Sequence, residues 1–199
     1  MNSCQNWIRC HKSNTMLTNQ TFTEEQIEQW RFPHGPMPNP DSVSKPELVQ
    51  FIIEIGLFPS QVRDLTEGLS KEQLEFRYRP DGWCIRQIVH HCADSHMNSI
   101  IRYKLALTED NPEIRPYFED RWAELADVEQ SIETSLTILG GLHARWVTLL
   151  KSIKDDDWGR VYIHPEYKTT FRLDAATAAY AWHCRHHHRH MELALENQF

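Results

Sequence analysis

The sequence lacks the features that mark several large protein classes. Its net charge is −7 with the histidines neutral, so it has no excess of basic residues for binding a nucleic-acid backbone. No apolar run approaches the roughly 18 residues of a membrane span, and the first twenty residues contain no apolar core of a signal peptide. We therefore expect a cytoplasmic protein with neither nucleic-acid nor membrane partners.

Cysteine pairs and glycine-rich loops are missing as well. The cysteines are odd in number, and none of them form a CxxC pair: Cys4, Cys10, Cys84, Cys92 and Cys184. This pattern argues against a disulfide framework and against a thiolate zinc site. With only 7 glycines, the chain has neither a phosphate-binding loop nor a nucleophile elbow. Nucleotide-dependent and serine-hydrolase functions thus have no support.

The chain is long enough, at 199 residues, for one domain with a substantial core. Residues 1–30 are polar and lack steady periodicity, which predicts a poorly structured extension within which Met16 is an alternative start of translation. Five prolines between Pro33 and Pro46 then predict an extended linker or arm. We assign residues 31–199 to a single domain.

Helical periodicity dominates that domain. Ser44 and Pro46 predict the start of the first helix, and Pro59 predicts a kink or break near Phe58. Short helical turns are expected between the long helices, and residues 161–173 alternate as in a small hairpin. The pattern indicates an all-α, up-and-down four-helix bundle, with long helices at about 45–65, 85–107, 131–153 and 174–195.

The last predicted helix carries a dense group of histidines in the stretch "WHCRHHHRHMELAL". At about 100° per residue, four of them share one face. Two histidines four positions apart on a helix can bind one metal ion. Both His183/His187 and His186/His190 have this spacing, and periodicity does not choose between the pairs. The alternative interpretation is a solvated helix face.

A metal site needs a further donor from another helix. The segment "CIRQIVHHCADSHMNSIIRYKLAL" places His91 at the centre of a polar stripe that also contains Asp94 and Arg102. This stripe lies opposite an apolar one, and a solvated face is again the alternative. In a bundle, inward polar stripes of neighbouring helices meet, so the two histidine signals support each other.

Two long segments resemble the YfiT-like branch of the DinB superfamily: "YRPDGWCIRQIVHHCADSHMNSIIRYKLALTEDNPEIRPY" and "LDAATAAYAWHCRHHHRHMELAL". The resemblance runs from about Arg31 to Leu195 and includes "GLHARWVTLL". It implies a four-helix bundle that binds one divalent ion through three histidines. By motif position these would be His91, His186 and His190. The resemblance further implies a homodimer, with zinc as the ion and nickel as an alternative.

The resemblance also implies a metal-dependent hydrolase that activates water for attack on a small-molecule substrate. Asp94 is a candidate to orient a ligand or act as general base, and Arg102 to hold an anionic substrate group; for both, a structural ion pair or hydrogen bond is the alternative. Two other functions use the same ligands. One is a metal-dependent transferase or isomerase that activates a low-molecular-weight thiol, and the other is a non-catalytic module with a structural ion.

Overall fold

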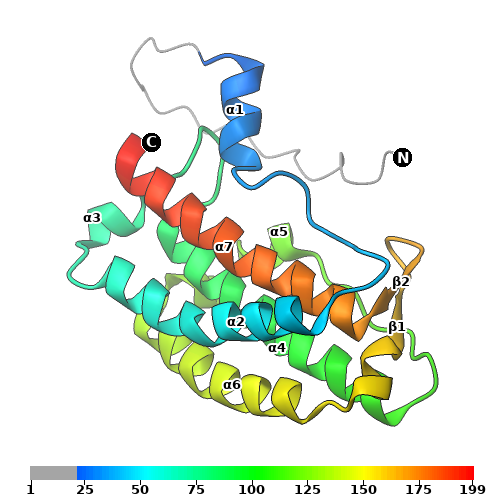
Figure 1. Ribbon diagram of the computed structural model, residues 1–199. Helices are drawn as coiled ribbons and strands as arrows, with labels where there is room; N and C mark the ends of the chain where they lie inside the picture. The colour runs from blue at the N-terminus through cyan, green and yellow to red at the C-terminus, as the bar shows by residue number, and fades with distance from the viewer. Residues whose placement is uncertain (1–21) are drawn as a thin grey trace.

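A computed structural model describes residues 22–199. Four long helices form a bundle (Figure 1): α2 (Lys45–Thr66), α4 (Ile85–Thr108), α6 (Ile132–Ser152) and α7 (Leu173–Asn197). Helices α2 and α4 each pack against both α6 and α7, so the order around the bundle is α2, α6, α4, α7. The predicted all-α four-helix bundle is therefore confirmed.

The directions of the helices differ from the expected up-and-down order. His90 near the start of α4 contacts Ser135 near the start of α6, and farther along Tyr103 packs edge to face on Trp146. These two helices are therefore parallel, because residues 109–131 lead the chain back along the bundle before α6 begins. Helices α2 and α7 run in the opposite direction (Figure 1).

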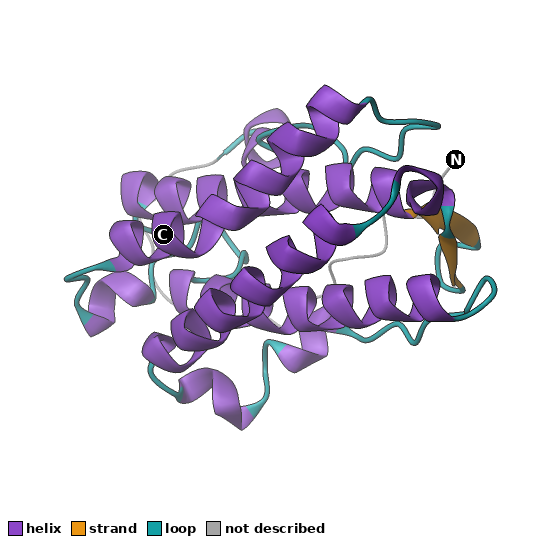
Figure 2. Ribbon diagram, turned by 60° about the horizontal axis from the view of Figure 1, so that its bottom comes forward, coloured by secondary structure: helices purple, strands orange, loops and turns teal. Residues whose placement is uncertain are grey.

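Shorter elements surround the bundle, as Figure 2 shows. A two-stranded antiparallel hairpin pairs Tyr162 with Phe171 at one end of the molecule. The predicted hairpin and the predicted short helical turns between the long helices are thus confirmed. The short elements are α1 (Glu24–Arg31), α3 (Lys71–Leu74), α5 (Glu119–Trp122), η1 (Ala126–Glu129), η2 (Asp155–Gly159), β1 (Val161–His164) and β2 (Thr169–Arg172).

Helix α1 lies within residues 1–30, where a poorly structured extension was expected. Thr23 and Gln26 cap its start reciprocally, each side chain bonding the other's backbone N–H. Trp30 packs against the Phe199 ring at the end of the chain. Phe22 packs on both of these rings, so a capping box and a cluster of aromatic contacts produce order where periodicity gave no signal. Residues 1–21, with Met16, Cys4 and Cys10, lie outside the described part.

The proline in α2 does not interrupt the helix, so the predicted break near Phe58 is absent. Pro59 has no N–H, and the carbonyl four residues earlier, at Ile55, loses its usual helical donor. His143 of α6 replaces that donor, with its Nδ1 2.6 Å from the Ile55 oxygen. A bond from the neighbouring helix therefore compensates for the missing backbone bond.

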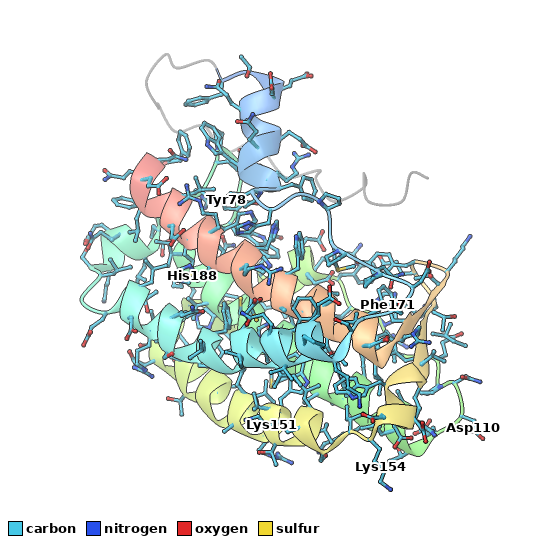
Figure 3. The ribbon with its side chains drawn as sticks, viewed as in Figure 1. Tyr78, Asp110, Lys151, Lys154, Phe171 and His188 are labelled. Atoms are coloured by element: carbon cyan, nitrogen blue, oxygen red, sulfur yellow. The ribbon has the colours of Figure 1, made fainter. Side chains whose placement is uncertain are left out.

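Buried side chains lie along the axis of the bundle. Charged side chains such as Lys151, Lys154 and Asp110 are exposed at the periphery (Figure 3). The largest fully buried side chains include Trp146 and Tyr103 at the centre. Within the described residues, none of the helices combines the length and the apolarity needed to cross a membrane.

Candidate metal centre

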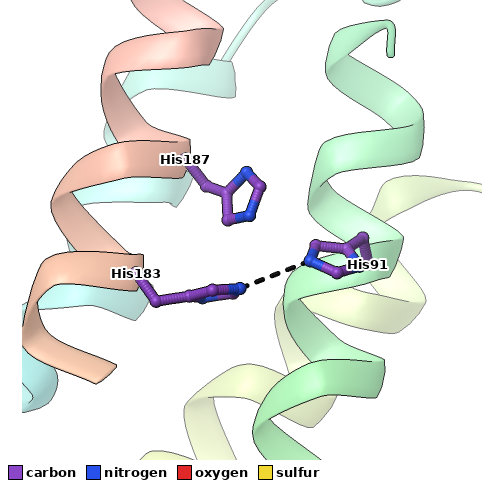
Figure 4. Close-up of side chains that lie close together, drawn as sticks. All are labelled: His91, His183 and His187. Atoms are coloured by element: carbon purple, nitrogen blue, oxygen red, sulfur yellow. Dashed lines mark hydrogen bonds between the residues drawn. The ribbon is translucent and has the colours of Figure 1, made fainter. Parts of the chain in front are cut away.

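Three histidines converge between α4 and α7. His91 comes from α4, whereas His183 and His187 lie one turn apart on α7 and face it (Figure 4). Their possible ligand atoms all lie within 4.8 Å of one another. The Nε2 atoms of His91 and His183 are 3.3 Å apart. This set, called the histidine triad below, is the one group of three or more possible ligand residues found among residues 22–199.

One separation within the histidine triad fits a shared cation. Two nitrogens bound at about 2.0–2.1 Å to a tetrahedral ion lie about 3.3 Å apart, which is the separation of the two Nε2 atoms of His91 and His183. The same distance also suits an N–H···N hydrogen bond. His187 Nδ1 is buried and has no hydrogen-bond partner among the described residues. A divalent cation would be bound by one ring nitrogen from each of the three histidines.

Burial keeps these imidazoles neutral. It lowers the pKa of His91 to about 3. Burial, followed by the neighbouring histidines, also holds the pKa values of His183 and His187 well below the ordinary value. The ring of Trp83 covers one side, with its centroid 4.6 Å from that of His91. Neutral imidazoles keep the lone pairs that metal binding requires.

The structure does not bring the other two predicted ligands, His186 and His190, into the histidine triad. His190 Nε2 lies 3.2 Å from the Arg31 carbonyl, to which it donates, and its ring stacks on Tyr78 at 3.9 Å. His186 stacks on Trp182 at 4.2 Å. Of the two pairs that periodicity left open, His183/His187 therefore faces His91. The pair taken from motif position, His186/His190, faces the end of α1 and Phe32 after it.

A row of buried histidines continues behind His183. Its Nδ1 lies 3.1 Å from Nε2 of His96, whose own Nδ1 lies 2.8 Å from Nε2 of His143. The row ends at the Ile55 carbonyl. Sequence analysis assigned no role to His96 or His143, although both lie within the quoted motifs, in "ADSHMN" and "GLHARW".

Asp94 is not part of the histidine triad. Burial, followed by the negative charge of Asp127, raises the pKa of its carboxyl to about 6. The backbone carbonyl of Asp94 accepts a hydrogen bond from the side-chain amide of Asn98, one turn later on α4. The catalytic role of Asp94 stays a prediction.

Arg102 lies nearer to the histidine triad. Its guanidinium contributes to lowering the pKa of His183 and donates to the hydroxyl of Tyr180 at 3.4 Å. Glu119 was not among the predicted site residues. It lies close enough to Arg102 for their charges to interact, and burial raises its pKa to about 7. The role of Arg102 also stays a prediction, as do the homodimer and the cytoplasmic location.

Comparisons with known proteins agree with this architecture. The family described as the DinB superfamily matches residues 57–191. A protein of Bacillus mycoides strain KBAB4, named "Putative metal-dependent hydrolase", is 44% identical over 165 residues, covering 83% of this chain and 95% of its own length. One of the same name from Bacillus cereus strain 03BB102 is 44% identical over 161 residues, covering 81% and 92%.

A solved structure gives the same result. YfiT from Bacillus subtilis, described as a probable metal-dependent hydrolase with an unusual four-helix bundle topology, superposes with a TM-score of 0.82 at 38% identity. The match covers 85% of this chain and 97% of YfiT. Both the family and the resemblance predicted from the motifs are thus confirmed. The chain belongs to the DinB superfamily.

Proposed function

We propose that this protein is a metal-dependent hydrolase that binds one divalent cation through His91, His183 and His187. Zinc suits three neutral nitrogen donors, and nickel is the alternative. The observation that carries the proposal is the convergence of these three imidazole side chains from two helices. The names of the relatives support it, since they read "Putative metal-dependent hydrolase" and "probable metal-dependent hydrolase".

Each part of the site has a chemical task in this proposal. Three neutral ligands leave the cation its full charge, which lowers the pKa of a coordinated water towards about 7. The chain keeps the ligands neutral by burying them. Trp83 shields His91 on one side, whereas His183 is only half-buried, which leaves it the most accessible of the three.

Arg102 indicates the class of substrate. Its side chain is half-buried, and it takes part in none of the ion pairs formed by residues 22–199. A guanidinium that has no carboxylate in salt-bridge contact, and only the more distant charge of Glu119 acting on it, favours an anionic group. We therefore include in the proposal a small substrate that carries a negative charge beside the bond to be hydrolysed.

Metal content by elemental mass spectrometry tests the ligand set. After incubation with zinc and removal of the free ion, we expect about one ion per chain in the wild-type protein and in His190→Ala. We expect none in His91→Ala or His183→Ala while the helical circular dichroism is retained. Zinc retained in His183→Ala, or lost from a folded His190→Ala, would overturn the assignment.

Hydrolysis assays test the reaction. A pair of esters that differ in one carboxylate should show preference for the charged substrate, and Arg102→Gln should raise its KM while leaving that of the neutral ester unchanged. Turnover that requires an added low-molecular-weight thiol would favour the transferase or isomerase instead. Unfolding on chelation, with no turnover of either ester, would favour a structural ion.

A further inference from the structure

The row of histidines behind His183 has a defined direction of hydrogen bonding. At its far end the acceptor is the Ile55 carbonyl, which has no proton to give. His143 Nδ1, 2.6 Å away, must therefore carry the hydrogen. The Ile55 carbonyl therefore determines which ring nitrogen carries the hydrogen in each histidine of the row.

A neutral imidazole carries a hydrogen on one nitrogen and a lone pair on the other. Since His143 Nδ1 carries the hydrogen, its Nε2 accepts, and His96 Nδ1 at 2.8 Å must donate. By the same reasoning His96 Nε2 accepts, and His183 Nδ1 at 3.1 Å must donate. The nitrogen left with a lone pair is His183 Nε2, the atom that faces His91 at 3.3 Å.

Neutral rings are expected along the whole row. His96 and His143 are 0% and 1% exposed. Burial lowers the pKa of His143 to about 4. Among the ion pairs formed by residues 22–199, His188 is the one histidine, so no carboxylate in contact compensates a charge on His96 or His143.

The acceptor at the end of the row is available because of Pro59. In an uninterrupted helix the N–H of residue 59 would bond the carbonyl of residue 55. Proline has no N–H, and α2 nevertheless continues through this point to Thr66. The Ile55 carbonyl therefore faces α6 without its helical donor and accepts from His143 instead.

We propose that Pro59, His143 and His96 act as positioning residues that set the tautomer of His183, so that its Nε2 lone pair points to the metal centre. The proposal rests on the proposed function in one respect only, the assignment of His183 as a ligand. None of the three residues touches substrate or metal. They act through His183, as hydrogen-bond partners behind a ligand commonly do.

The first test uses the full chain without metal. Nitrogen-15 chemical shifts and two-bond nitrogen–hydrogen couplings identify which ring nitrogen carries the hydrogen. We expect the Nδ1–H form for His183, His96 and His143 alike. An Nε2–H form of His183 in the wild-type protein would overturn the proposal. This readout needs neither metal nor activity, so it stays valid if the proposed function fails.

The second test measures zinc affinity by competition with a chelating indicator. His143→Leu removes both the donor to Ile55 and the acceptor for His96, and we expect a loss of about 10- to 100-fold. His143→Gln supplies one amide donor and one amide acceptor, so it should restore most of the affinity. His90→Leu is the matched control, because His90 is buried on α4 but bonds Ser135 and Gln130 instead of the row.

Pro59→Ala guards against a loss of affinity that merely reflects damage to the fold. Alanine restores the N–H that competes for the Ile55 carbonyl, and it is a better helix former than proline. We expect an unchanged or higher unfolding midpoint together with zinc affinity several-fold lower. Unchanged affinity and unchanged His183 tautomer in both Pro59→Ala and His143→Leu would overturn the proposal. Zinc binding that survives His183→Ala would instead overturn the ligand assignment.

Discussion

Two pairs of histidines on α7 have the same spacing, yet only one belongs to the histidine triad. His183/His187 and His186/His190 are both four residues apart, and burial lowers the pKa values of all four. What differs is the group across from each pair. The first pair faces an imidazole nitrogen of α4, whereas the second faces a backbone carbonyl and aromatic rings.

That difference decides which pair can share a cation. The Arg31 carbonyl accepts a hydrogen bond from His190 Nε2. This nitrogen therefore carries the hydrogen and has no lone pair for a metal ion. In the described residues the Nδ1 atoms of His186 and His190 are buried without partners, but no third donor joins them. Spacing on one helix is therefore necessary for the site, and the facing element completes it.

The largest expected effect that tests this comparison is the stabilisation by zinc. A ligand that binds only the folded state at 100 times its Kd adds about 2.7 kcal/mol to the free energy of unfolding. For a chain of this size that corresponds to a rise in Tm of roughly 5–10 °C. We expect the rise in the wild-type protein and in His186→Ala, and its loss in His187→Ala. Differential scanning calorimetry with and without zinc measures it.

The two variants are matched, since each removes one buried imidazole from the same helix. A zinc-dependent rise that disappears in His186→Ala and persists in His187→Ala would reverse the comparison. It would restore the ligand pair taken from motif position.

Sequence patterns predicted much of the fold but not the rotation of α7. The bounds of the long helices and the shared histidine face follow from periodicity and capping, which are local properties. The two candidate pairs differ by a rotation of only about 60° about the helix axis. Which one turns towards His91 depends on α1, whose last residue, Arg31, contacts His190, a contact between residues 159 positions apart.

The role of Pro59 was hidden for a similar reason. Locally it predicts an interrupted helix, because the pattern does not reveal a donor on another helix. The bond that replaces the missing one joins Ile55 to His143, 88 positions later. Such a compensation depends on tertiary packing, which single-sequence periodicity does not contain.

A smaller effect concerns stability in acid. The pKa of His186 is about 3 in the folded protein because of burial, against about 6.5 when unfolded. The unfolded state therefore binds one more proton between these values, and stability falls as pH decreases from 6.5 towards 3. At pH 5 the cost is about 2 kcal/mol. The free energy of unfolding of His186→Gln, relative to that of wild type, should therefore be higher by about this amount at pH 5 than at pH 8, as measured by urea unfolding.

Zinc sharpens this measurement. If His186 is not a ligand, the difference between wild type and His186→Gln should be the same with zinc and without it. A difference that appears only in the absence of zinc would mean that the ion competes with the proton at His186, and would place this residue in the metal centre.

The smallest effect is expected at Asp94, on the same helix as His91 but outside the histidine triad. Its folded pKa is about 6, raised by burial and Asp127, so the folded state binds the extra proton. Stability therefore decreases as pH rises from about 4 through 6. Because the carboxyl is only half-buried, solvent screening reduces the penalty at pH 7 to about 1 kcal/mol. In urea unfolding, Asp94→Asn should recover this penalty, and its affinity for zinc should be unchanged. A weaker affinity for zinc would instead show that Asp94 orients a ligand and belongs to the metal centre.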